Sequence, residues 1–336
     1  MTGKELVLSA LEHKPVPRTP YSIGLTEEAR ASMVAYYQDE SFGSEPIGDM
    51  VMSPVIKVEF GVRDAAGIYT DEFGVKWDRT RDPDIGIPRP CLTPDTLDNF
   101  AWPNPRSADR FSVLEANLAR YPDKFQIMGL DLSLYERAWS LVGLESLLID
   151  MVANQTFVEA LLDRILEFNL GVVDAGLSRF PDVDAVYFGD DFGTQRGVVM
   201  GEQRWCELLK PRLAKQYQRV KEHGKKVFIH SCGAVADLFT HLVEIGVDCF
   251  NPFQPEVMDI YSLKNEYQGR LAFWGGISTQ RLLPFGTMDE VREELFKLQE
   301  MATAGGYIAA PAHAIPGDAK PENVALMLEM LAKGSS

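Results

Sequence analysis

Two residues at the end of one short apolar run could together bind a metal ion. The stretch KKVFIHSCG (225–233) ends with His230 and Cys232. Residues two apart on a strand project from the same face, so the imidazole and the thiol would lie side by side. Both are good zinc ligands, and a catalytic zinc takes three protein ligands and keeps one position open. His313 closes a later apolar run, 81 residues after Cys232, and is the candidate third ligand. The alternative is that His230 bonds to a backbone carbonyl and Cys232 packs as a small hydrophobic residue.

Other apolar runs also end in polar residues or glycine, namely Asp131, Asp190 and Asp191, Asn251 and Gln254, and Gly275 and Gly276. Adjacent carboxylates could bind a cation, position a substrate or act as acid and base, or they could simply cap a helix. Because neighbours on a strand face opposite sides, we expect at most one of the two aspartates to face a site. The amides and Asp131 would line a substrate pocket, and the glycine pair would allow close approach of the backbone.

The elements that must position these residues alternate regularly from residue 125 onward. Short β-rich runs occur at 125–131, 185–191, 226–232, 247–252, 271–276 and 307–313. Helical patterns separate them, including 234–246 and 287–306, the latter with Thr287 and Glu290 at capping-box spacing. Strands that alternate with helices form parallel sheets, because a crossover helix returns the chain in the same direction. Two weaker runs, at 19–24 and 53–60, would bring the strands to eight.

We therefore predict an α/β fold, a (β/α)₈ TIM barrel, as a single domain over residues 1–336. Residues 1–124 form its irregular N-terminal part, with a helix at the start and a hairpin within 67–81, and 125–336 form the regular units. An open doubly wound sheet is disfavoured because no glycine-rich phosphate loop follows the first strand. Active sites of TIM barrels lie at the carboxyl ends of the strands, where the polar residues occur.

Composition excludes several classes of partner. The net charge of −16 argues against a nucleic acid, which would require clustered Lys and Arg. No apolar run of 18 residues is present, so we expect no membrane span. Four cysteines in 336 residues suggest no disulfide framework, and a reducing cytoplasm fits best.

The sequence resembles the uroporphyrinogen decarboxylase superfamily, which includes the decarboxylase of haem synthesis and zinc-dependent methyltransferases that work with corrinoid proteins. The matching segments are DEFGVKWDR (71–79), GDDFGTQRG (189–197), HSCGAV (230–235), GVDCFNPFQPEVMD (246–259), FWGGISTQRLLPFGT (273–287) and GGYIAAPAHAIPGDAKPENV (305–324). The resemblance implies the same TIM barrel. The arginine motif with which the decarboxylase grips substrate carboxylates is absent from 16–30, so the methyltransferase branch is the nearer one.

In that branch zinc is held by an H-x-C pair and a late cysteine. His230 and Cys232 match the pair, and His313 stands where the late cysteine would fall. One thiolate and two imidazoles would leave zinc at a formal charge of +1, which makes it a stronger Lewis acid. We expect the three ligand atoms to approach within about 3–4 Å of one another even without metal.

The first hypothesis is therefore a methyltransferase that uses zinc and a corrinoid, which a partner protein would present. Asp190 or Asp191 would orient the substrate or accept a proton. A metal-free decarboxylase of a tetrapyrrole or another carboxylated ring is the alternative, with His313 and an aspartate managing the proton. A barrel that binds a corrinoid or pterin without catalysis is the third class. The sequence leaves a homodimer open.

Overall fold

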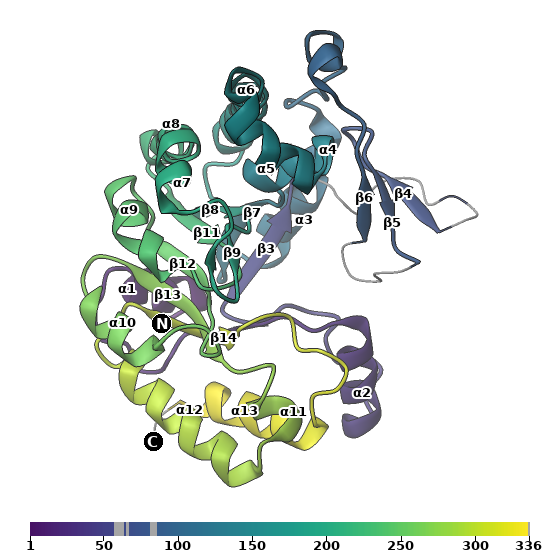
Figure 1. Cartoon of the computed structure of the whole chain (residues 1–336). Coiled ribbons are helices and arrows are strands. Elements are labelled where there is room, and N and C mark those ends of the chain that lie inside the picture. The colour runs from purple at the N-terminus through teal and green to yellow at the C-terminus, as the bar shows by residue number, and fades with distance from the viewer. Residues whose placement is uncertain (57–63, 65–66, 81–85, 335–336) are drawn as a thin grey trace.

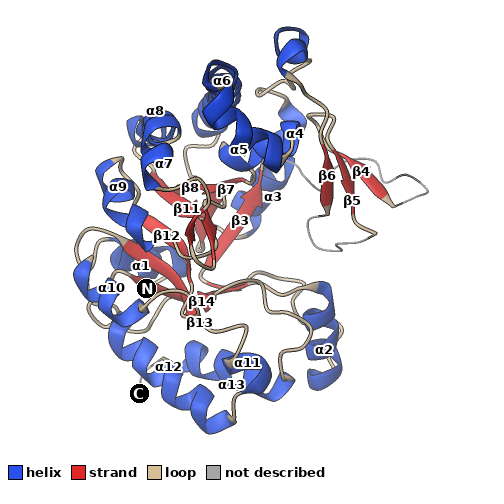
Figure 2. Ribbon diagram, viewed as in Figure 1, coloured by secondary structure: helices blue, strands red, loops and turns tan. Residues whose placement is uncertain are grey.

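A curled parallel β-sheet with helices on its outside forms the centre of the molecule (Figures 1 and 2). The computed structural model describes residues 1–56, 64, 67–80 and 86–334. Within these residues the sheet has seven strands, in the order β14-β13-β12-β11-β8-β7-β3. They are β3 (Met50–Pro54), β7 (Phe125–Leu130), β8 (Ala185–Gly189), β11 (Lys226–His230), β12 (Cys249–Phe253), β13 (Ala272–Ile277) and β14 (Tyr307–Pro311).

The predicted alternation of strands and helices is present. The helices are α1 (Gly3–Leu11), α2 (Glu27–Tyr37), α3 (Ser112–Arg120), α4 (Tyr135–Val142), α5 (Leu144–Ala153), α6 (Gln155–Arg179), α7 (Glu202–Leu208), α8 (Lys210–Glu222), α9 (Phe239–Glu244), α10 (Ile260–Glu266), α11 (Leu282–Phe285), α12 (Met288–Ala302) and α13 (Pro321–Lys333). Three 3₁₀ helices are η1 (Pro94–Asn99), η2 (Ala108–Phe111) and η3 (Ala236–Leu238). The capping box predicted from Thr287 and Glu290 begins α12, with both reciprocal bonds formed.

Among the described residues, no eighth strand joins this sheet. In place of the predicted run at 19–24, β1 (Ser22–Ile23) pairs antiparallel with β2 (Ile47–Gly48). Isolated parallel bridges join Tyr21 to Ala309 and Leu25 to Ile315, so this segment runs along the free edge of β14. The predicted strand at 53–60 begins earlier, at Met50, and residues 57–60 lie outside the described part of the chain. The sheet is thus barrel-like, and the complete (β/α)₈ barrel stays a prediction.

Alternation along each strand divides the core into two clusters. Outward residues such as Val186, Phe188 and Ile229 pack with the helices in the larger cluster. Inward residues form a smaller cluster inside the curl, which α1 covers at the amino ends of the strands. The inward set is Val7, Leu11, Met50, Phe125, Ile127, Ala185, Tyr187, Phe228, Cys249, Ala272, Trp274, Ile308 and Ala310. His230 and Asn251 continue the inward rows begun by Phe228 and Cys249, so period two alone brings them to the inner mouth of the sheet.

The predicted hairpin is part of a small antiparallel sheet beside α4 (Figure 1). It consists of β4 (Ile68–Thr70), β5 (Lys76–Asp78) and β6 (Ile87–Arg89). Asp71, in its turn, is buried and forms an ion pair of 2.6 Å with Arg137 of α4, and it also accepts a hydrogen bond from Trp77 Nε1. Among the described residues of 72–77, none lines the cavities discussed below.

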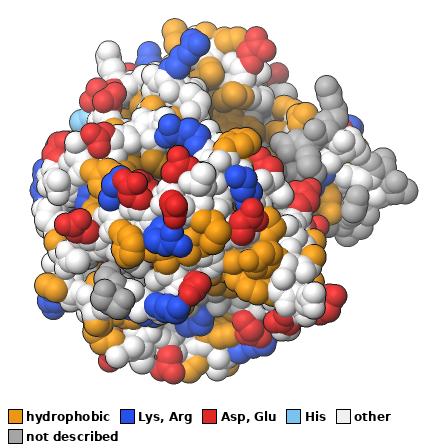
Figure 3. Space-filling model, turned by 90° about the horizontal axis from the view of Figure 1, so that it is seen from below, with side chains coloured by type: hydrophobic (Ala, Val, Ile, Leu, Met, Phe, Trp, Pro, Cys, Tyr) orange, Lys and Arg blue, Asp and Glu red, His pale blue; other side chains and the backbone are white. Residues whose placement is uncertain are grey.

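No helix in the described part of the chain is long and apolar enough to cross a membrane. The face seen from below in Figure 3 mixes acidic, basic and hydrophobic side chains without a block of one charge.

Candidate metal centre

Strand register brings the candidate ligands together. His230 ends β11 and pairs with Gly189 on β8 and Asn251 on β12. Asp191 therefore follows β8 directly beside His230, and Cys232 follows β11 on the same side. A short hairpin of β9 (Gly193–Thr194) and β10 (Gly197–Val198) packs against the Cys232 loop. A Cβ atom on Gly193 would lie 2.4 Å from the carbonyl oxygen of Cys232, so only glycine allows this close contact.

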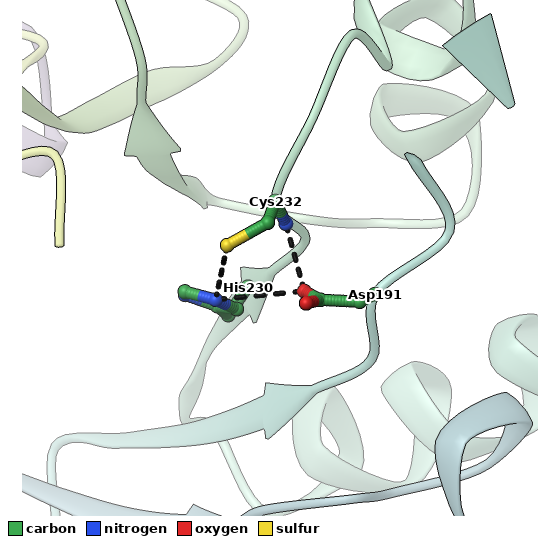
Figure 4. A group of neighbouring side chains, drawn as sticks. All are labelled: Asp191, His230 and Cys232. Carbon is green, nitrogen blue, oxygen red and sulfur yellow. Dashed lines mark hydrogen bonds and ion pairs between the residues drawn. The ribbon is translucent and has the colours of Figure 1, made fainter. Parts of the chain in front are cut away.

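Three ligand atoms converge at this point (Figure 4). Cys232 Sγ lies 3.3 Å from His230 Nε2, and His230 Nε2 lies 3.5 Å from Asp191 Oδ1. Among the described His, Cys, Asp and Glu residues, these three form the one group with all ligand atoms within 4.8 Å of one another. Tetrahedral zinc ligands with bonds of about 2.0–2.3 Å lie roughly 3.3–3.7 Å apart. The two distances given above fit that spacing.

A hydrogen-bond relay fixes the tautomer of His230. Asn251 Nδ2 donates to the Trp274 carbonyl at 3.0 Å, which turns its Oδ1 toward His230 Nδ1 at 2.6 Å. Because Oδ1 can only accept, Nδ1 must carry the hydrogen. In a neutral imidazole the lone pair is then on Nε2, the atom that faces Cys232 and Asp191. Metal-bound histidines are commonly held in this way, with the second nitrogen donating to an oxygen.

Electrostatic interactions among the neighbouring side chains favour a proton on His230. Burial lowers the pKa of this imidazole, but the contact with Cys232, the charge of Asp191 and the bond to Asn251 together raise it to about 10. Asp191 is anchored in turn, since its Oδ1 accepts the Cys232 amide at 2.8 Å. The cluster therefore concentrates negative charge around one imidazole, which is the electrostatic pattern that suits a divalent cation.

The two adjacent aspartates face opposite ways. Asp190 is fully buried, and its carboxylate accepts from the amides of Leu134, Tyr135 and Glu136, at 2.7 to 3.1 Å. It therefore holds the amino end of α4. Burial raises the pKa of Asp190 to about 7 although these bonds act to lower it.

The structure places His313 apart from the converging group. Its side chain is exposed in the loop after β14 and lines two cavities, one shared with His230 and one shared with Cys232. The expected approach of its nitrogen to His230 and Cys232 within about 3–4 Å is not seen, and Asp191 occupies that third position instead.

The remaining predicted site residues have mixed surroundings. Gln254 lines the cavity beside Cys232, and its Oε1 lies 3.4 Å from the Gly233 amide. Asp131 is half-buried directly after β7. The glycine pair makes room for protein: a Cβ on Gly275 would lie 2.5 Å from Phe253 N, and one on Gly276 would lie 2.4 Å from the Tyr307 hydroxyl. Their close backbone approach is therefore to neighbouring residues.

Sequence reasoning missed Glu136, in the first turn of α4. Its carboxyl is buried, and burial together with the charges of Asp191 and Asp190 raises its pKa well above the ordinary value. The signal available in the sequence was an acidic residue shortly after the predicted strand that ends near Leu130, a place where site residues of this fold occur.

The sequence matches the description "Uroporphyrinogen decarboxylase (URO-D)" over residues 2–333. The chain belongs to the URO-D family. A solved structure described as a methyltransferase from Methanosarcina mazei is similar, with a TM-score of 0.73, 17% identity and coverage of 99% of both chains. At that identity the likeness establishes the fold of this URO-D member. A structure of Dispersin B covers 83% of this chain and 84% of its own at 13% identity, but its TM-score of 0.34 is too low to indicate the same fold. No curated protein matches the sequence.

Proposed function

We propose that this URO-D family member is a zinc-dependent methyltransferase that moves a methyl group between a small substrate and a corrinoid presented by a partner protein. The observation that carries the proposal is the convergence of Cys232, His230 and Asp191 at zinc-ligand spacing, with His230 already oriented by Asn251. Bound zinc would supply Lewis-acid polarisation of a substrate oxygen or sulfur.

Each residue then has a distinct task. His230 and Cys232 hold the metal, and Asp191 is the third ligand in the arrangement described. His313 stands between the two cavities, where it can contact the substrate or replace Asp191 as a ligand. A thiolate, a carboxylate and an imidazole leave zinc formally neutral, whereas exchange of Asp191 for His313 gives +1. With His313 in place of Asp191, zinc would be the stronger Lewis acid.

The buried carboxyl of Glu136 is suited to proton handling. Its raised pKa favours the protonated carboxyl at a higher pH than for an ordinary glutamate, beside Asp191 and within the electrostatic influence of His230. We propose that the protonated Glu136 donates a proton to the substrate oxygen or sulfur as its methyl group leaves, and that in the opposite direction its carboxylate accepts the proton that a thiol loses as it takes up a methyl group. Asp190 would position Glu136 by accepting a hydrogen bond from the amide of the same residue at 2.7 Å.

The test uses free methylcobalamin in place of the partner protein. Zinc-loaded protein and a panel of thiols are mixed with it, and loss of the cobalt-bound methyl is followed by absorbance. We expect turnover that a chelator abolishes and that Cys232→Ala lacks. Gln254→Ala, which alters the adjacent cavity but no ligand atom, should keep its zinc. Full turnover by Cys232→Ala, or by chelated protein, would contradict the proposal.

The family match keeps a metal-free decarboxylase as a second candidate. Among the described residues, neither cavity beside the metal centre is lined by Lys or Arg that could hold substrate carboxylates. Loss of carboxylates from uroporphyrinogen in the presence of a chelator would favour this candidate.

A further inference from the structure

Two cavities of different character meet at the candidate metal centre. His230 lines one of about 430 Å³, inside the mouth of the curled sheet. Cys232 lines the other, of about 480 Å³, together with Gln195, Gln254 and Gln280. Both volumes are in the usual range of small-molecule sites, about 300–1,000 Å³. The cavity beside His230, named here the inner cavity, has the more unusual lining.

The inner cavity is walled by hydrophobic and aromatic side chains. Its wall includes Met50, Val51, Ile127, Tyr187, Trp274 and Ala310, and each of these side chains is at least nine-tenths buried. Among the described residues that line it, none is Lys, Arg, Asp or Glu. Its titratable side chains are Tyr187, His230 and His313. Both nitrogens of His230 are already engaged, by Asn251 on one side and by Cys232 and Asp191 on the other.

Apart from His230, whose imidazole is paired with Asp191, this lining offers no charged partner to a ligand of either sign. A buried carboxylate or sulfonate without a partner pays a large desolvation cost. Burial raises the pKa of Tyr187 well above its usual range, and the charges of Asp131 and Asp191 raise it further. Those two charges would also repel an anion. A cation gains attraction from them but finds no carboxylate in the wall itself.

We infer that the inner cavity binds an uncharged, mainly apolar small molecule, the substrate that exchanges its methyl group in the proposed reaction. That this molecule is the substrate rests on the proposed function, whereas the preference for an uncharged ligand depends on the lining of the cavity alone. It assigns the polar, amide-lined cavity beside Cys232 to the other reactant.

The experiment compares two probes that differ by one charged group. 2-Methoxyphenol is uncharged, and 4-hydroxy-3-methoxybenzoate carries the same ring with a carboxylate. Binding is measured by calorimetry at pH 8, on both zinc-loaded and metal-free protein, with phenyltrimethylammonium as the cationic probe. We expect the uncharged probe to bind at least tenfold more tightly than either charged one. Equal or tighter binding of a charged probe would overturn the inference, as would failure of 2-methoxyphenol and its alkyl ether analogues to bind.

A charge-insertion variant tests the location. Met52 lines the inner cavity and is 40% exposed, so Met52→Arg can add a guanidinium at its rim with little strain. It should tighten binding of the carboxylated probe at least tenfold. The matched control is Met288→Arg, at an equally exposed position (44%) on α12 that does not line the cavity, and it should leave the preference unchanged. An identical response in both variants would place the binding elsewhere. Calorimetry needs neither zinc nor turnover. The assignment of the inner cavity can therefore be refuted while the zinc site is confirmed, and the zinc site can be refuted while the assignment of the cavity is confirmed.

Discussion

Replacing Asn251 by leucine should weaken zinc binding without touching a ligand atom. The amide joins His230 Nδ1, at 2.6 Å, to the Trp274 carbonyl, at 3.0 Å. Leucine is similar in size but cannot accept, so His230 loses the partner that holds its hydrogen on Nδ1. Loss of such a partner typically costs 10–100-fold in metal affinity, or about 1.4–2.7 kcal/mol.

The assay is competition for zinc against a chromophoric chelator at fixed pH. Asn251→Asp keeps an acceptor for Nδ1 and should retain most of the affinity. The control is Asn323→Leu, which removes another buried asparagine whose amide donates to the carbonyls of Leu283 and Gly286. It should lower stability but leave zinc affinity unchanged. An unchanged affinity in Asn251→Leu would refute the idea that this relay prepares His230 for a metal.

Further predictions concern protons and the hairpin. Because the pKa of His230 is raised to about 10, zinc must displace its proton, and it must also displace the proton of any Cys232 thiol. Zinc affinity measured by the same competition should therefore rise at least about tenfold per pH unit from pH 6 to 9. A flat profile would contradict this. Glu136 has a raised pKa, so its contribution to stability is present below its unfolded pKa and is lost as pH rises through the folded value. When the free energy of unfolding is measured in urea from pH 5 to 9, Glu136→Gln should therefore reduce its decline with rising pH. The same decline in variant and wild type would contradict a raised pKa for Glu136. Asp71→Ala should cost about 3–5 kcal/mol of unfolding free energy, since it leaves Arg137 buried without its partner and frees Trp77 Nε1; a loss under 1 kcal/mol in urea unfolding would show that the pair is not needed.

The parts of the structure that were predictable depend on local periodicity. Alternation of β-rich runs and helices predicted the parallel strands, and the i, i+2 spacing predicted that His230 and Cys232 share a face. Local capping chemistry predicted the start of α12 at Thr287. These features are set by residues close together in the sequence, so the pattern contains them.

The parts that were not predictable depend on loops and on register. Asp191 reaches the site because β8 and β11 pair with Gly189 beside His230, which no local pattern reveals. His313 lies apart because the path of the loop after β14 decides its position, and spacing along the chain does not fix that path. The pKa of Glu136 is raised by its burial and by the charges of Asp191 and Asp190, which are 55 and 54 positions away in the sequence. Both causes come from tertiary structure.

The central claim is that His230 and Cys232 belong to a zinc site, and metal content tests it most directly. The full chain, purified without a histidine tag and freed of excess metal, is analysed by elemental mass spectrometry beside Cys232→Ala. The account predicts about one zinc per wild-type chain and only a trace in the variant, with both proteins folded by circular dichroism. A trace of zinc in the wild type after incubation with zinc, or equal zinc in both proteins, would contradict it.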